Sequence, residues 1–235
     1  MLPLVNQWET LNEQIVNCER CARLRDYCQQ VAQTKRRAFQ GEVYWGKPIP
    51  NFGSPSARLL IVGLAPAAHG GNRTGRLFTG DASGDFLFDA LHETGFCNQP
   101  TSTHRNDGLV LHDCAICSAV RCAPPDNKPT PEERAQCLPF LVQTVRLMPN
   151  LKGFLALGQL AMEACVAVAH TEGFLPSGLR PKFEHGAFYP LEGGRFLAVS
   201  YHPSARNTYT KLLTKPMMVA LLNQVRRQLD ECEGR

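Results

Sequence analysis

The segment that decides the fold is Arg58-Leu-Leu-Ile-Val-Gly-Leu64, a short apolar run that ends in Gly63 and Leu64. An uninterrupted apolar run of this length predicts a parallel strand that is buried on both faces of a sheet. Three more segments are predicted to be strands, at residues 113–120, 153–158 and 195–201. Helices are predicted around and between these strands, at residues 4–30, 85–95, 130–148, 159–169 and 215–231.

Alternation of strands and helices predicts an α/β fold in which helices cover both faces of a parallel sheet. Ligands of such folds bind where the carboxyl ends of the strands meet. Polar loops follow three of the predicted strands, at residues 63–84, 121–131 and 202–207. We therefore expect these three loops to converge on one site.

The composition is that of one globular domain over residues 1–235, with 43% hydrophobic and 20% charged residues. A net charge of +4 permits a nucleic-acid partner without requiring one. The first residues lack the basic start and apolar core of a signal peptide. The longest apolar stretch, residues 153–170, contains Gln159 and Glu163 and is a poor membrane span. We expect a cytoplasmic monomer with no membrane partner.

Ten cysteines are many for a chain in a reducing compartment, where they serve as metal ligands or core residues rather than as disulfides. Cys18 and Cys21 form a CxxC pair, and Cys122 and Cys137 flank a proline-rich turn. Two such pairs can supply four thiolates to an iron–sulfur cluster or to zinc, or they can be scattered core residues. A second CxxC pair, at residues 114 and 117, lies in a predicted strand, where this spacing points the two side chains to opposite faces.

The loop at residues 63–84 is rich in glycine but matches no phosphate-binding motif. Arg76 and Leu77 stand where a P-loop needs Lys and Ser or Thr, and the dinucleotide fingerprint is absent. An anion-binding loop remains open. Phe78 and Asp81 suit a flipped base and an attacking water, although a helix N-cap and a core aromatic are the ordinary roles for such residues.

Three long segments together resemble the family 5, or type B, uracil-DNA glycosylases. They are GLAPAAHGGNRTGRLFTGDASG at residues 63–84, AVRCAPPDNKPTPEERAQC at residues 119–137 and SYHPSARNT at residues 200–208. The resemblance extends from about residue 18 to residue 215. It implies a three-layer α/β/α sandwich with a four-stranded parallel sheet. It also implies a [4Fe–4S] cluster bound by Cys18, Cys21, Cys122 and Cys137.

The resemblance implies roles for individual residues as well. Asp81 positions water, Phe78 stacks on the extruded base, Asn127 belongs to the active site, and His202 is a donor to the base. Ala67 and Gly63 complete the base-binding set. Ser204, Arg206 and Asn207 are expected at phosphates of the DNA. Further arginines and a lysine are either additional phosphate contacts or plain surface residues: Arg73, Arg76, Arg121 and Lys128.

The expected reaction is hydrolysis of the N-glycosidic bond of a flipped-out uracil, which leaves an abasic site in the DNA. Related strict uracil enzymes carry a tyrosine where this chain has Ala67, and an acid or amide near Leu64. The smaller residues predict activity on other deaminated bases too. No lysine in the three loops is suited to attack the sugar, because Lys128 has no apolar neighbours that would lower its pKa, so we expect no lyase activity.

Three alternatives remain open from the sequence. One is a glycosylase that acts mainly on another deaminated base, such as hypoxanthine. A second is an iron–sulfur DNA-binding protein without catalysis, which would not need Asp81. The third is a nucleotide-binding α/β enzyme, which the missing P-loop lysine disfavours.

Overall fold

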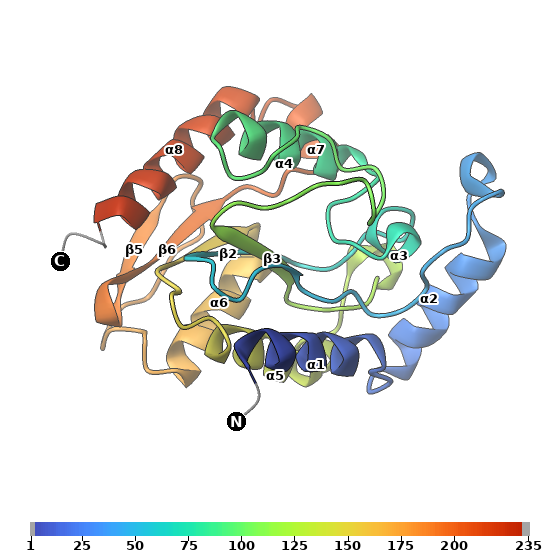
Figure 1. The fold of residues 1–235 in the computed structure, drawn as a ribbon, viewed down its shortest axis with the longest axis horizontal. Coiled ribbons are helices and arrows are strands. Elements are labelled where there is room, and N and C mark those ends of the chain that lie inside the picture. Colours follow the sequence, from blue (N-terminus) through green and yellow to red (C-terminus); the bar gives the residue numbers. More distant parts are fainter. Residues whose placement is uncertain (1–2, 232–235) are drawn as a thin grey trace.

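The computed structural model describes residues 3–231, which form a six-stranded sheet between two layers of helices (Figure 1). The strand order is β1-β3-β2-β4-β6-β5. The four central strands are parallel to one another, as predicted, and both edge strands are antiparallel to their neighbours. The strands are β1 (Phe52–Gly53), β2 (Leu59–Gly63), β3 (Cys114–Ser118), β4 (Gly153–Leu157), β5 (Phe188–Leu191) and β6 (Arg195–Ser200).

The expectation of four strands was therefore wrong, because the sheet has two further strands at its edges. β1 is only two residues long, and β5 contains Pro190, which cannot donate a backbone hydrogen bond to a neighbouring strand. Only Leu191 among their six residues is buried, so neither strand has the fully buried pattern of β2, β3 and β4. Both strands are held by pairing with a neighbour rather than by their own sequence pattern.

The helices form two layers, one on each face of the sheet (Figure 1). Leu59, Ile61 and Leu155 point into a core under α4 and α8, whereas Leu60 and Phe154 point into a second core under α1, α5 and α6. This alternation confirms the three-layer sandwich. The helices are α1 (Leu4–Val16), α2 (Ala22–Thr34), α3 (Gly71–Thr74), α4 (Ala82–Glu93), α5 (Pro131–Arg146), α6 (Gln159–Thr171), α7 (Ala205–Tyr209) and α8 (Lys215–Glu231).

The single helix expected over residues 4–30 is two helices with a turn between them. Ile15 and Leu24 are both fully buried, yet nine residues correspond to about two and a half helical turns. One continuous helix would therefore place these two side chains on opposite sides. The turn at residues 17–21 resolves this conflict, and it presents Cys18 and Cys21 where the two helices meet.

Cys114 and Cys117 lie on opposite faces of β3, as predicted from their spacing. Cys114 belongs to the core under α4 and α8, and Cys117 belongs to the core on the other face of the sheet. Both thiols are buried core residues. Within residues 3–231, none of the helices is both long enough and apolar enough to cross a membrane.

Candidate active site at the carboxyl edge of the sheet

The loop after β2 folds back so that Phe78 lies on the strand end that precedes it. A Cβ atom at Gly63 would lie 2.9 Å from Cζ of Phe78, so the ring needs a glycine beneath it. Phe78 has φ of +52°, an unfavourable backbone conformation for a bulky side chain, and is 6% exposed. Strained backbone that surrounding contacts hold in place is a feature of binding sites.

His202 follows β6 and reaches the same place from the other side. Its ring centroid lies 6.0 Å from that of Phe78, with 38° between the ring planes. Gly158, just after β4, leaves room for it, since a Cβ there would lie 3.3 Å from Cβ of His202. The side-chain amide of Asn207 donates to the carbonyl oxygen of His202 at 2.8 Å. Burial lowers the pKa of His202 to about 4, so the imidazole is neutral at pH 7.

Asp81 begins α4 and has the N-cap role that its position suggested. One carboxylate oxygen accepts the backbone N–H of Gly84 at 2.9 Å. The other oxygen packs so closely on Gly70 that a Cβ there would overlap it. Burial raises the pKa of Asp81, and hydrogen bonds from the backbone of Gly84 and Ser83 oppose this rise. The N-cap interaction thus occupies one oxygen of a carboxylate that also faces a hollow.

That hollow brings together residues from separate loops, and we call it the Asp81 hollow. Asp81, Ala67 and Asn127 all line it, so the loops that begin after β2 and β3 meet here. The third predicted loop, after β6, contributes no residue to this hollow and reaches the site through the contact of His202 with Phe78. Asn127 is exposed and has φ of +57°. The remaining residues that line the hollow are Tyr27, Arg36, Phe39, Ala68, His69, Gly70, Gly80, Ala82 and Asp126.

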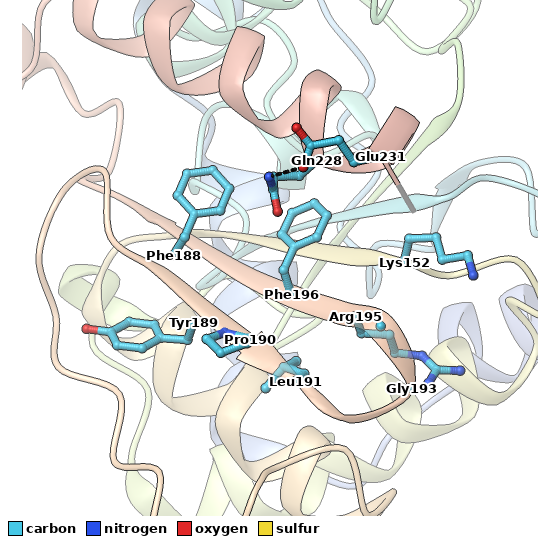
Figure 2. Close-up of a pocket in the computed structure, with 11 residues that line it drawn as sticks. Lys152, Phe188, Tyr189, Pro190, Leu191, Gly193, Arg195, Phe196, Gln228 and Glu231 are labelled. Carbon is cyan, nitrogen blue, oxygen red and sulfur yellow. Dashed lines mark hydrogen bonds between the residues drawn. The ribbon is translucent and has the colours of Figure 1, made fainter. Parts of the chain in front are cut away.

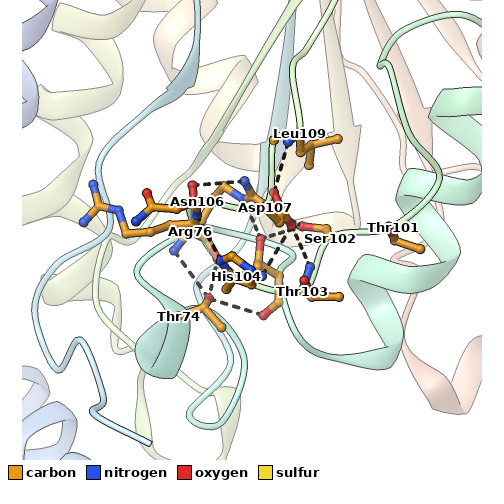
Figure 3. Close-up of polar contacts among 12 residues, drawn as sticks. Thr74, Arg76, Thr101, Ser102, Thr103, His104, Asn106, Asp107 and Leu109 are labelled. Atoms are coloured by element: carbon orange, nitrogen blue, oxygen red, sulfur yellow. Dashed lines mark hydrogen bonds and ion pairs between the residues drawn. The ribbon is translucent and has the colours of Figure 1, made fainter.

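A buried ion pair holds the segment that presents both Phe78 and Asp81 (Figure 3). Arg76 donates to Asp107 at 2.7 Å and to the hydroxyl of Thr79 at 2.9 Å, and the two charged side chains are 5% and 6% exposed. Asp107 also accepts the backbone N–H of Thr103 at 2.8 Å. Burial acts to raise the pKa of Asp107, but the hydrogen bonds from Arg76 and the backbone outweigh it and lower the pKa to about 2.

Three of the arginines considered as phosphate contacts are buried instead. Arg73, Arg76 and Arg121 are 8%, 5% and 2% exposed. Arg73 pairs with Glu42, and Arg76 pairs with Asp107. Neither a phosphate contact nor a plain surface role fits such burial. In the His202 loop, Arg206 is exposed, while the Ser204 hydroxyl caps α7 by accepting the backbone N–H of Asn207 at 3.3 Å.

The four cysteines of the predicted ligand set line one small pocket between the N-terminal helices and α5. Cys18 and Cys21 come from the turn between α1 and α2, and Cys122 and Cys137 come from the chain after β3 and from α5. Among residues 3–231, no three His, Cys, Asp or Glu side chains are grouped closely enough for a single metal ion. Four thiols that surround one pocket, but are too far apart for a single ion, are suited to a cluster, because a cluster spans a greater distance than one ion.

Two buried arginines give this pocket an unbalanced positive charge. Arg25 and Arg121 both line it. Within residues 3–231, the Nε atoms of both, and one terminal nitrogen of Arg121, are buried and find no hydrogen-bond partner. Unpaired buried cations are costly, so the pocket is suited to an anionic occupant. An iron–sulfur cluster with four thiolate ligands is such an anion, and the residues present therefore fit it.

Two residues that the sequence analysis does not single out, His69 and Arg36, also line the Asp81 hollow. The hydroxyl of Tyr44 lies 3.0 Å from Nδ1 of His69. The position of His69, directly before Gly70 in the glycine-rich loop, was the signal available in the sequence.

A second hollow lies at the opposite end of the sheet, beside the edge strand β5 (Figure 2). Lys152 precedes β4 and Arg195 begins β6, so this is the amino edge of the parallel strands. Phe188 and Phe196 form one wall, with ring centroids 5.8 Å apart, and Gln228 of α8 forms another. None of the predicted site residues lines it.

Comparison with known proteins identifies the family. The Uracil DNA glycosylase superfamily matches residues 50–226. A type-5 uracil-DNA glycosylase of Thermus thermophilus is 46% identical over 222 residues, which cover 93% of this chain and 97% of that protein. Type-5 enzymes of Mycobacterium leprae and Mycobacterium tuberculosis are 46% and 44% identical, over 88% and 92% of this chain and 90% and 80% of their own lengths.

Proposed function

This chain belongs to the type-5 family of the uracil DNA glycosylase superfamily, and on that premise we propose that it removes uracil from DNA by hydrolysing the N-glycosidic bond. The observation that carries the proposal is the Asp81 carboxylate, partly buried against Gly70 in a hollow shared with Asn127. A carboxylate in such a place positions water for attack at the sugar of a flipped-out nucleotide.

The reaction breaks the bond between C1′ of the sugar and N1 of uracil, and the electron pair leaves with the base. Positive charge develops on the sugar and negative charge on the base. Asp81 stabilises the sugar, orients the water that adds to C1′ and accepts the proton that this water loses, and the released uracil anion takes up a proton from solvent. Phe78 stacks on the base, and the neutral His202 donates a hydrogen bond to its O2 oxygen. Asn127, at the rim of the Asp81 hollow, contacts the flipped nucleotide.

We further propose that the enzyme accepts other deaminated bases. Ala67 lines the Asp81 hollow with a single methyl group, and Leu64 offers no polar group that would read the edge of one base. Discrimination by apolar contacts such as these is weak, because one extra methylene group changes binding by only about 1–3 kcal/mol.

The same proposal assigns the enzyme no lyase activity. Lys128 is the nearest lysine in the site loops, and it is exposed at the end of the proline-rich turn. Among the described residues that line the Asp81 hollow there is no lysine, so no side-chain amine is placed to attack the sugar there. Water is then the only nucleophile, and the product is an intact strand with an abasic site.

DNA duplexes that carry uracil, hypoxanthine or 5-hydroxymethyluracil test these statements together. We expect strand breaks only after alkali, fastest release for uracil, and measurable release of the other two bases. Borohydride should trap no enzyme–DNA adduct. Release of no base from uracil-DNA would refute the activity, uracil as the sole substrate would refute the broad base choice, and a trapped adduct would refute hydrolysis by water alone.

The cofactor is also part of the proposal. Cys18, Cys21, Cys122 and Cys137 hold a [4Fe–4S] cluster, and the unpaired nitrogens of the two buried arginines balance its negative charge. When bound, the cluster would supply a cross-link between the N-terminal helices and α5, while Asp81, Phe78, Asn127 and His202 perform the chemistry.

Anaerobically purified protein should be brown, with four irons and four sulfides per chain on the basis of the cluster type. Cys137→Ser should lower the iron content and the visible absorption. Cys165→Ser is the matched control, because Cys165 is buried in the core on the other side of the sheet from α8 and does not line the pocket. Colourless protein with stoichiometric zinc would contradict the cluster.

A further inference from the structure

The Asp81 hollow has a donor wall that the chemistry above does not use. His69, between Ala68 and Gly70, lines the hollow together with Arg36. The carbonyl oxygen of His69 accepts a hydrogen bond from Nε of Arg73 at 2.8 Å, and Arg73 is itself buried. The backbone of His69 is therefore fixed close to the carboxylate of Asp81, which packs on the next residue.

The hydrogen bonds of Tyr44 indicate which nitrogen of His69 carries the proton. Tyr44 is 6% exposed, and its hydroxyl oxygen accepts the backbone N–H of Arg36 at 3.4 Å. Its single proton needs an acceptor, and in the described part of the chain Nδ1 of His69, at 3.0 Å, is the one in reach. Because Nδ1 accepts, the neutral imidazole carries its proton on Nε2.

The charges around His69 keep it neutral. Burial, followed by the positive charges of Arg36 and Arg73, lowers its pKa. The hollow contains the acids Asp81 and Asp126 and the cation Arg36, whose guanidinium makes no ion pair within residues 3–231. A neutral N–H donor beside an uncommitted guanidinium is suited to an anion that carries several acceptor oxygens.

We propose that Nε2 of His69 and the guanidinium of Arg36 bind a phosphate of the DNA backbone next to the flipped-out nucleotide. This subsite rests on the proposed function, which places the sugar of that nucleotide at Asp81. Phosphates flank that sugar on both sides, and the two acids repel them from their part of the hollow. His69 and Arg36 supply the donors on the remaining part, and Tyr44 is a positioning residue that fixes the donor nitrogen.

Methylphosphonate substitution tests the contact directly, because it replaces a charged phosphate oxygen by a methyl group. The probe is a duplex with 2′-fluoro-2′-deoxyuridine, which resists cleavage, and with one methylphosphonate at each flanking position in turn. Binding is measured by fluorescence anisotropy. At one position the wild-type protein should lose about tenfold in affinity, as expected for a hydrogen bond to a charged group.

His69→Ala should bind the unmodified probe about tenfold more weakly and lose less than about threefold further at that same position. His69→Gln, which keeps an N–H donor, should stay within about threefold of the wild type, and Tyr44→Phe should fall between them. His112→Ala is the matched control, because His112 is exposed two residues before β3, at the amino edge of the sheet. Equal methylphosphonate losses in wild type and His69→Ala at every position would overturn the subsite.

The dependence of binding on salt separates the two donors. Arg36→Ala should reduce the slope of log K against log salt by about 0.7–0.9, because one fewer counterion is released. His69→Ala should leave the slope unchanged, since its imidazole is neutral. A reduced slope for His69→Ala would contradict the neutral donor.

Failure of this subsite and failure of the proposed function give different results. If the wild-type protein releases uracil but His69→Ala shows the wild-type pattern of methylphosphonate losses, the subsite alone is wrong. If the wild-type protein releases no uracil, the proposed function is wrong, whatever the binding experiments show.

Discussion

Two hollows lie at opposite edges of the sheet, and they differ in the kinds of residue that line them. The Asp81 hollow contains a partly buried carboxylate and a histidine whose pKa values are shifted by burial, and loops after two different strands form its walls. The hollow beside β5 is lined by aromatic rings, a glycine turn and surface polar groups such as Lys152 (Figure 2).

This difference indicates that the direction of the parallel strands, rather than the presence of a hollow, determines where the candidate catalytic residues gather in this fold. The loops at the carboxyl edge bring Asp81 and Asn127 into one hollow, and they bring His202 against Phe78, although these residues are far apart in the sequence. At the amino edge, the hollow is formed by an edge strand and by the end of α8, and it gathers no such set.

The strongest test of this comparison is Asp81→Asn. Asparagine keeps an oxygen for the N-cap of α4 but cannot stabilise the charged sugar, so we expect the single-turnover rate to fall by about 10³-fold with affinity for uracil-DNA nearly unchanged. In the wild type, the rate should fall with decreasing pH as Asp81, whose pKa is raised by burial, becomes protonated. Asp81→Asn should lack that acidic limb.

A wild-type rate in Asp81→Asn would place the chemistry elsewhere. A different result, DNA binding by the wild type without any base release, would favour the alternative of an iron–sulfur DNA-binding protein.

His202→Ala should have the next largest effect on the rate. Loss of one donor to the departing base costs on the order of 10²–10³ in single-turnover rate. His202→Gln keeps a donor and should retain more activity than His202→Ala. Because the pKa of His202 is about 4, its protonation should not affect the rate between pH 6 and 8, on the order of two units or more above that value. Equal rates for His202→Ala and the wild type would remove it from the mechanism.

Asp107→Asn tests the buried support behind the site. Removing one partner of a buried ion pair should lower the free energy of unfolding by about 3–5 kcal/mol at pH 7, measured by urea denaturation. The depressed pKa of about 2 means that this stabilisation is present above the ordinary aspartate pKa and disappears as the pH falls towards 2.

The matched control for Asp107→Asn is Glu163→Gln, which breaks the more exposed pair between Arg134 and Glu163. That variant should lose less than about 1 kcal/mol. Similar losses for the two variants would show that the pair between Arg76 and Asp107 is no stronger than a surface pair.

The smallest effect is expected at the amino edge. Lys152→Ala and Gln228→Ala remove polar groups from the hollow beside β5, and the rate of uracil release should stay within about twofold of the wild type. A loss of tenfold or more in either variant would mean that the amino edge also takes part in the reaction, which would break the comparison.

The central strands and the terminal helix were predictable because their signals are local. A run such as Leu59–Gly63 is apolar at every position, and only a strand buried on both faces accommodates it. The capping box of α5, with Thr130 and Glu133, likewise marks a helix start that nearby residues determine. The family resemblance rested on contiguous motifs and needed no contact across the fold.

Features that depend on contacts between distant segments were decided by the tertiary structure alone. The break between α1 and α2 follows from which sides of two helices find a partner, and the edge strands β1 and β5 exist through pairing with their neighbours. Arg121 was a plausible surface residue until folding buried it beside four cysteines. No partner of His69 is evident from the sequence, because Tyr44 and Arg36 are distant from it along the chain and come close to it only in the folded structure. A residue's type and neighbours in the sequence set its chemistry, but burial and the partners that folding brings determine how that chemistry is used.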